Sequence, residues 1–170
     1  EIKQLQLDNV IQPRLADGLA AIHPADHIDT ITIAGMGGTL IAKILDADQS
    51  KLSGVKRLVL QPNVGGERVR EWLLTNRWQI MAEEVLEEDD HIYEIIVAEP
   101  SLVPFAYNDR ELKFGPFLLE QDSPAFKKEW QAELARQETA IKQMQKAAQP
   151  PVEKIREFEK EMQMIKEVIK

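Results

Sequence analysis

Residues 30–38 read TITIAGMGG and decide the fold of this chain, because an apolar run ends there in three glycines within four residues. A second apolar run, Leu58–Leu60, ends in the polar turn formed by Gln61, Pro62 and Asn63. A helix-like segment follows each run, and this pattern is typical of neighbouring parallel strands in an open α/β sheet. Since ligands bind such sheets at the carboxyl ends of the strands, we expect the two loops to face one crevice.

The two loops offer a ligand different groups. The glycines of residues 35–38 lack a Cβ atom, so a ligand can approach the backbone closely. Their spacing is not the Gly-x-Gly-x-x-Gly of a nicotinamide site, and no Gly-Lys-Ser/Thr follows as in a P-loop. In the other loop a stiff proline turn carries two side-chain amides, which can hydrogen-bond the edge of a planar polar ligand. Asp17 and Gly18 are a turn signal at the end of a further short strand. The Asp17 carboxylate either accepts a hydrogen bond from an exocyclic amine of a ligand or only stabilises the turn.

The remaining pattern of the first 100 residues is that of an α/β domain. We expect the end of a helix up to about Leu7 and then a short strand at residues 10–12. Residues 39–45 and 67–76 predict helices, the second with Val69, Trp72 and Leu73 toward the core. Strands at 78–86 and 92–98 are separated by a short turn, so we expect an antiparallel pair that closes one edge of the sheet.

A change of composition at Ser123 marks a second region. Ser123 and Pro124 are a helix N-cap followed by proline at the first helical position, and Pro150 and Pro151 separate this helix from another. Apolar residues recur at spacings of three and four along both helices. The pattern predicts an antiparallel helical hairpin with coiled-coil-like packing, and a division into residues 1–121 and 122–170.

Composition limits the class of protein. The 170 residues are 44% hydrophobic, which is enough for one α/β domain and little more. No apolar run reaches the ~18 residues of a membrane span. The absence of cysteine excludes disulfides and thiolate metal sites and is consistent with a cytoplasmic protein. No group of histidine, aspartate and glutamate residues has the spacing of metal ligands, so we expect no metal.

The charge of the chain argues only weakly against a nucleic-acid partner. The net charge is −8, and phosphate contacts need cations, but basic residues are concentrated locally, for example at Lys127, Lys128 and Arg136. We interpret the carboxylates of residues 83–90 as a solvated hairpin tip rather than an acid–base pair. The three histidines are scattered and favour solvated roles.

The chain resembles one known family in four segments. These are residues 32–41, residues 58–63, residues 93–99 (Tyr-Glu-Ile-Ile-Val-Ala-Glu), and residues 115–118 ahead of the helical hairpin. Together, and in this order, they resemble the bacterial tRNA (adenine-N1)-methyltransferases that modify adenine 22. The resemblance implies a class I, S-adenosylmethionine-dependent Rossmann-like domain followed by a C-terminal coiled coil, with methyl transfer to adenine N1 of a flipped base in tRNA.

The resemblance also implies residue roles. Asp17 and Gly18 match the turn beside the adenine of the methyl donor. The loop near its methionine part and methyl group is matched by Ala34, Gly35, Met36 and Gly37. The loop that faces the target base is matched by Gln61, Pro62 and Asn63, which carry the catalytic role, while a direct role for Tyr93 and Glu94 is open.

One departure from the family concerns the first two strands. The family's first strand, its glycine-containing donor loop and its second strand have no counterpart in this sequence, so the sheet is expected to be incomplete. By analogy we expect the chain to lack about 55 to 65 residues at its N-terminus, and this piece alone to be inactive. The absent Met at position 1 agrees with that expectation.

Two other functions remain open from the sequence. The acceptor of the methyl group can be another RNA, a protein amide or a small molecule; in glutamine methyltransferases the Asn-Pro element follows the fourth strand rather than the fifth. Alternatively, the helical hairpin is an interaction module on a non-catalytic scaffold. The tRNA species and the oligomeric state are not specified by the sequence.

Overall fold

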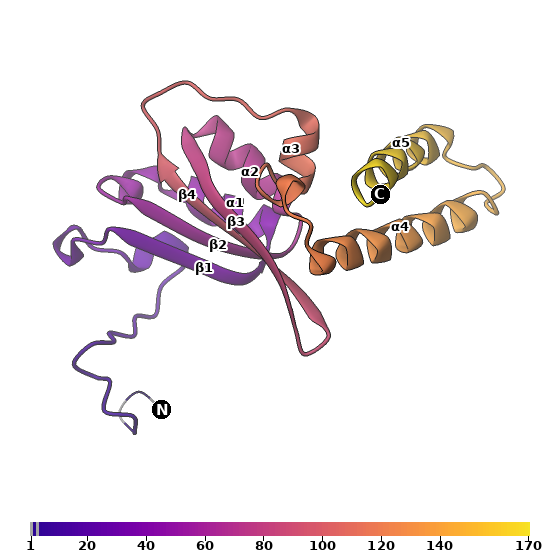
Figure 1. Cartoon of the computed structure of the whole chain (residues 1–170). Helices are drawn as coiled ribbons and strands as arrows, with labels where there is room; N and C mark the ends of the chain where they lie inside the picture. Colours follow the sequence, from indigo (N-terminus) through magenta and orange to yellow (C-terminus); the bar gives the residue numbers. More distant parts are fainter. Residues whose placement is uncertain (1, 3) are drawn as a thin grey trace.

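The computed structural model describes residue 2 and residues 4–170, and it is built around a mixed four-stranded sheet in the order β1-β2-β4-β3 (Figure 1). The strands are β1 (Thr30–Gly37), β2 (Arg57–Val64), β3 (Trp78–Glu88) and β4 (His91–Pro100). β1 and β2 are parallel, whereas β4 is antiparallel to both β2 and β3. The predicted parallel pair and the predicted antiparallel pair are therefore both confirmed.

One face of the sheet carries the main core. Along β1, Ile31 and Ile33 are buried while Thr30 and Thr32 are exposed, because successive side chains of a strand point to opposite faces. Two helices, α1 (Gly38–Ala47) and α2 (Gly66–Thr75), pack against each other and against the buried face. They contribute Ile41, Leu45, Val69, Trp72 and Leu73 to the core. Both helices were predicted at nearly these bounds.

The predicted strand at residues 10–12 is wrong. Residues 4–6 and 8–10 form turns, residues 11–16 are irregular, and short 3-10 helices follow at Gly18–Ala21 and Pro24–Asp26. Val10 is 70% exposed and Ile11 is 42% exposed, so no neighbouring strand covers or pairs with this segment. The predicted helix end falls partly on Glu1 and Lys3, which lie outside the described residues. The expectation that two further strands are missing stays a prediction.

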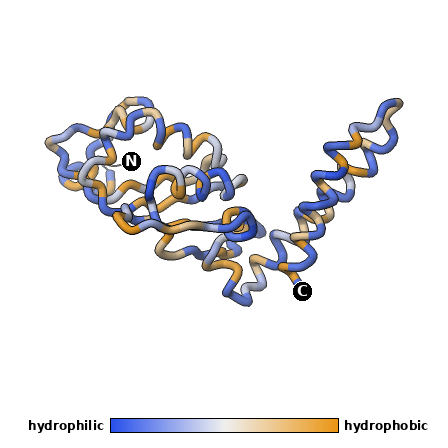
Figure 2. Tube along the Cα trace, turned by 90° about the horizontal axis from the view of Figure 1, so that it is seen from above, coloured by the Kyte–Doolittle hydropathy of each residue, from blue (hydrophilic) through white to orange (hydrophobic). Residues whose placement is uncertain are grey.

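The C-terminal part consists of helices. After α3 (Asp109–Phe114) and a 3-10 turn at Leu118–Glu120 come two longer helices, α4 (Pro124–Met144) and α5 (Val152–Val168). α4 and α5 contact each other and extend away from the sheet (Figures 1 and 2). The Ser123 hydroxyl accepts a hydrogen bond from the Phe126 N–H at 3.4 Å, as expected for an N-cap. None of the described helices is both long enough and apolar enough to cross a membrane.

A second apolar cluster joins these helices to the sheet. It contains Val85 of β3, Phe114 of α3, Leu118, Phe126 of α4 and Ile165 of α5. Phe114 also packs edge-on against Trp130, with ring centroids 4.5 Å apart. Since this cluster draws on residues from both sides of position 121, the proposed division into residues 1–121 and 122–170 stays a prediction.

Candidate active site

The two strand ends that the sequence singles out lie side by side and are linked by one side chain. The Gly35 N–H donates a hydrogen bond of 2.7 Å to Gln61 Oε1, and Gln61 Nε2 donates one of 3.0 Å to Asn63 Oδ1. In the register of β1 and β2, Ala34 lies opposite Gln61 and Gly37 lies opposite Val64. The structure therefore brings the glycine segment and the Gln-Pro-Asn segment together at one edge of the sheet.

The strand pairing continues further than the sequence predicts. Instead of ending at Ala34, β1 runs to Gly37, with an irregular register around Gly35. Gly35 has φ +76°, a left-handed conformation that side-chain-bearing residues adopt at a cost. A Cβ atom built on Gly35 meets no atom within 4 Å, so the space above this residue is open to a ligand.

The start of α1 is held close to the loop that follows β2. A Cβ atom built on Gly38 lies only 2.0 Å from the Gly65 carbonyl oxygen, so no larger residue fits there without a backbone shift. The N-cap residue, Gly37, provides no side-chain cap, and the first turn contains no acidic residue. The start of α1, where Thr39 and Leu40 are exposed, therefore presents the positive end of the helix dipole without a side-chain cap, and this suits a carboxylate or other anion.

Exposed apolar side chains surround the same edge. Met36 is 38% exposed, Leu40 is 48% exposed and Val64 is 72% exposed. Pro62, in contrast, is buried, so Met36 and Val64 rather than Pro62 provide the apolar surface next to Asn63. An apolar surface with an amide beside it can hold a planar base by stacking and hydrogen bonding.

Asp17 and Gly18 do not join this edge. A Cβ atom on Gly18 lies 3.1 Å from Ile44 Cγ2, and Ile44 is the seventh residue of α1, about 9 Å along the helix from its start. The segment that follows Gly18 packs near the amino ends of the strands, where Lys51 Nζ donates a hydrogen bond of 2.7 Å to the Ile22 carbonyl. The structure thus brings seven of the nine predicted site residues together and leaves these two apart.

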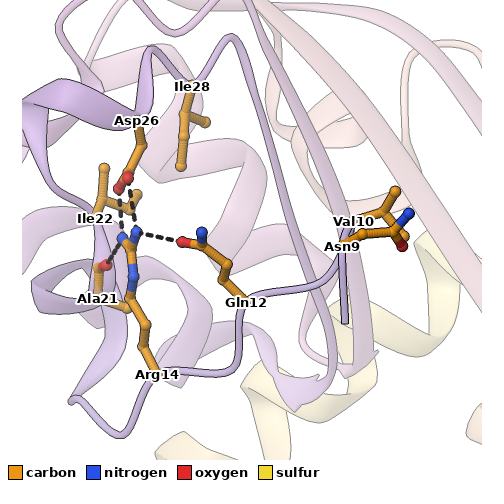
Figure 3. Close-up of a pocket in the computed structure, with 8 residues that line it drawn as sticks. All are labelled: Asn9, Val10, Gln12, Arg14, Ala21, Ile22, Asp26 and Ile28. Carbon is orange, nitrogen blue, oxygen red and sulfur yellow. Dashed lines mark hydrogen bonds and ion pairs between the residues drawn. The ribbon is translucent and has the colours of Figure 1, made fainter. Parts of the chain in front are cut away.

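A hollow beside this N-terminal segment has a structural role (Figure 3). Arg14 donates to both carboxylate oxygens of Asp26, to the Ala21 carbonyl at 2.8 Å and to Gln12 Oε1 at 3.1 Å. The hydrogen bonds from Arg14 hold the pKa of Asp26 well below its usual value. Arg14, Asp26 and the Gln12 oxygen in this hollow are thus bonded to one another and hold the N-terminal segment together.

Sequence reasoning missed a buried ion-pair network behind the site. The guanidinium of Arg70, which is 1% exposed, donates to Glu83 Oε1 at 2.6 Å and to Glu94 Oε1. The other oxygen of Glu83 accepts the Phe117 N–H at 2.9 Å. Burial raises the pKa of the Glu83 carboxyl, although the Arg70 charge opposes that rise. Glu83 is therefore not part of a solvated hairpin tip, and Glu94 is held by Arg70.

The network ties the elements around the site to one another. Arg70 Nη1 also donates to the Leu112 and Lys113 carbonyls, both at 3.3 Å. A Cβ atom on Gly66, the first residue of α2, lies 2.1 Å from Glu94 Oε2, so the carboxylate packs directly against the helix start. The network thereby fixes α2, which begins three residues after Asn63, against β3, β4 and α3.

Within residue 2 and residues 4–170, no group of three His, Asp or Glu side chains is placed to hold a metal ion. The groups that the ends of β1 and β2 present are the linked amides of Gln61 and Asn63, the apolar side chains of Met36 and Val64, and the start of α1.

Comparisons with known proteins agree with the resemblance seen in the sequence. The family profile described as tRNA (adenine(22)-N(1))-methyltransferase matches residues 1–167. The chain is 39% identical over 175 residues to the tRNA (adenine(22)-N(1))-methyltransferase of Bacillus subtilis, covering 99% of this chain and 73% of that protein.

Solved structures agree as well. A putative tRNA (m1A22) methyltransferase of Streptococcus pneumoniae, in complex with S-adenosyl-L-methionine, has 40% identity and a TM-score of 0.88, over 99% of this chain and 73% of that one. A Streptococcus agalactiae protein of the NADB-Rossmann superfamily has 42% identity and a TM-score of 0.89, over 99% of this chain and 72% of that one. The sheet described above is therefore that of a Rossmann-superfamily methyltransferase, and the chain belongs to the tRNA (adenine(22)-N(1))-methyltransferase family.

Proposed function

We propose that this chain carries the part of a tRNA methyltransferase that aligns the methyl donor with N1 of adenine 22. The observation that carries the proposal is the hydrogen-bonded link from Gly35 through Gln61 to Asn63, because it unites the donor-side segment and the acceptor-side segment of the family's site. The match of the family profile to residues 1–167 supports the choice of substrate.

The residues at the end of β1 fit the methionine end of S-adenosylmethionine. The donor supplies an electrophilic methyl group on a sulfonium. Ala34, Gly35, Met36 and Gly37 offer it exposed backbone, with open space above Gly35, and the uncapped first turn of α1 suits its carboxylate. Asp17 and Gly18 lie elsewhere in the structure, so their contact with the adenine end stays a prediction.

The acceptor side needs alignment more than proton transfer. Neutral adenine has a lone pair on N1 and no proton there, so a strong general base is unnecessary. Because N1 lies on the base-pairing edge, the adenine must leave its partner and enter the site from the solvent side of Asn63. Asn63 hydrogen-bonds the base and Met36 and Val64 support its plane, which holds N1 in line with the methyl group.

The helical hairpin is the proposed contact surface for the tRNA backbone. The proposed location of the protein is the cytoplasm. Several of its cations are paired with carboxylates, such as Lys128 with Glu87 and Arg136 with Glu133. These surface pairs are exposed to solvent, so they are weak and can exchange for phosphate contacts. This part of the proposal predicts a strong dependence of tRNA binding on salt.

The test is methylation of defined transcripts by the full-length protein with S-adenosylmethionine. We expect one methyl group per tRNA, located at N1 of adenine 22 by nuclease digestion and mass spectrometry, and none in a transcript with guanine at that position. Methylation of the guanine variant, or of another nucleotide, contradicts the proposed substrate. Failure to bind S-adenosylmethionine in calorimetry favours the non-catalytic scaffold instead.

A further inference from the structure

The direction of the hydrogen bonds that cross the site is fixed by one backbone group. A backbone N–H can only donate, so the Gly35 N–H requires that the oxygen of the Gln61 amide faces β1. The NH2 group of Gln61 then faces Asn63, and Asn63 has to turn its own oxygen, Oδ1, toward Gln61. Neither amide can be reversed without placing two donors or two acceptors against each other.

The consequence is that Asn63 presents its NH2 group outward. Among residue 2 and residues 4–170, Asn63 Nδ2 has no hydrogen-bond partner, and the residue is exposed. The group at the mouth of the site is therefore a donor, next to the apolar side chains of Met36 and Val64. A donor matches an acceptor nitrogen of a base and repels its exocyclic amine.

We propose that Gln61 is a positioning residue that orients Asn63 to donate to a ring nitrogen of the target adenine other than N1. The inference rests on the proposed function and adds to it which ring nitrogen of the target adenine Asn63 contacts. Adenine has three ring acceptors, N1, N3 and N7. A donor on N1 would occupy the lone pair that attacks the methyl group, so the bond goes to N3 or N7 and leaves N1 free.

The same side chain couples the donor and acceptor sides. Gln61 Oε1 is the acceptor that holds the Gly35 N–H while Gly35 adopts φ +76°, and Gln61 Nε2 holds Asn63. Loss of the Gln61 amide should therefore affect both the binding of S-adenosylmethionine and the recognition of the base. A residue that merely fills space would affect stability without changing which atom of the base is read.

The experiment uses tRNA that carries adenine, 3-deazaadenine or 7-deazaadenine at position 22, in single-turnover methylation by the full-length protein. With the wild-type protein we expect one of the two analogues to lose at least tenfold in rate relative to adenine, which identifies the nitrogen. If neither analogue loses rate, the proposal is overturned. If the tRNA with unmodified adenine is not methylated either, the proposed function fails as well. The two failures can be told apart, because only the reaction of unmodified adenine tests the proposed function.

Two variants test the role of Gln61. Gln61→Glu keeps an oxygen for the Gly35 N–H but places a second oxygen against Asn63, so the Asn63 amide must turn and present its oxygen. We expect this variant to bind S-adenosylmethionine within about twofold of wild type by calorimetry, to methylate adenine more slowly, and to lose the preference for adenine over the analogue. In Gln61→Leu both contacts are lost, so both binding and rate should fall.

A third variant keeps the test independent of substitutions at Gln61. Asn63→Asp still accepts the Gln61 hydrogen bond with one oxygen but presents only acceptors to the base. It should lose the discrimination between adenine and the deaza analogue, with an unchanged thermal unfolding midpoint. Discrimination that persists at the wild-type level in Gln61→Glu or in Asn63→Asp overturns the proposal.

Discussion

Replacing Arg70 by methionine removes the only cation that contacts two buried carboxylates in the described structure. The Glu83 side chain is 0% exposed and that of Glu94 is 13% exposed, so water replaces the lost hydrogen bonds poorly. A Cβ atom built on Gly115 lies 2.6 Å from Arg70 Nη2 and 2.7 Å from Glu83 Oε2, which shows how little space surrounds the pair. Breaking a buried pair in this way costs about 3 to 5 kcal/mol of unfolding free energy.

The loss should depend on pH. Burial already raises the pKa of Glu83, and removal of the Arg70 charge raises it further, while the unfolded chain keeps the ordinary value of 4.5. Between those two values the folded variant binds a proton that the unfolded chain does not, so its stability falls as the pH rises. We therefore expect a larger loss at about pH 8 than at about pH 5.

The assay is urea unfolding followed by the fluorescence of the buried tryptophans, Trp72 and Trp78. Arg68→Met is the matched control, since Arg68 is on the same helix but its ion pair with Glu71 is exposed, and it should cost no more than about 1 kcal/mol. The double variant Arg70→Met with Glu83→Gln should recover part of the loss. Equal effects of Arg70→Met and Arg68→Met, or a loss that does not change with pH, would refute this account of the network.

Two further predictions concern the site and the junction with the helices. Gly38→Ala places a Cβ atom 2.0 Å from the Gly65 carbonyl oxygen, so thermal unfolding should show a loss of about 1 to 3 kcal/mol and methylation should slow. Gly37→Ala is the control, because its Cβ atom lies 3.9 Å from Val64, and it should unfold like wild type. Equal unfolding midpoints for the two variants would contradict the close approach of Gly38 to Gly65. Burial, followed by the nearby Glu94 charge, raises the pKa of Glu129 from 4.5 to about 7, so the folded state loses stability as the pH rises through this window. Glu129→Gln removes this titrating group and should be more stable than wild type at about pH 8, by at most about 3 kcal/mol, and nearly equal to it at about pH 4, below the unfolded pKa, in urea titrations. Parallel pH profiles for the two proteins would contradict it.

The sequence was sufficient to predict a strand where the segment is apolar and continuous. Ile31, Ile33, Leu58 and Leu60 predict two buried strands, and the glycine and Gln-Pro-Asn segments after them predict where the ends meet. The strand at residues 10–12 failed because its apolar residues have no neighbouring strand in the described structure, and local pattern carries no information about a partner.

The buried role of Glu83 was hidden by a β-bulge. Strict alternation from Trp78 and Ile80 would place residue 84 inside and residue 83 outside. The register of β3 against β4 shifts between Ile80 and Ala82, which reverses the faces and buries Glu83 and Val85 instead. The amide link through Gln61 was equally out of reach, because it depends on a side-chain conformation and not on residue type.

The measurement that tests the central claim most directly is single-turnover methylation of tRNA by Asn63→Ala in the full-length protein. If the joined ends of β1 and β2 form the methyl-transfer site, the rate should fall at least tenfold while the affinity for S-adenosylmethionine stays within about twofold. Gln49→Ala, which removes an exposed amide ahead of β2 and away from both the site and the helical hairpin, should keep the wild-type rate. An Asn63→Ala protein that methylates adenine 22 at the wild-type rate would contradict the placement of the site.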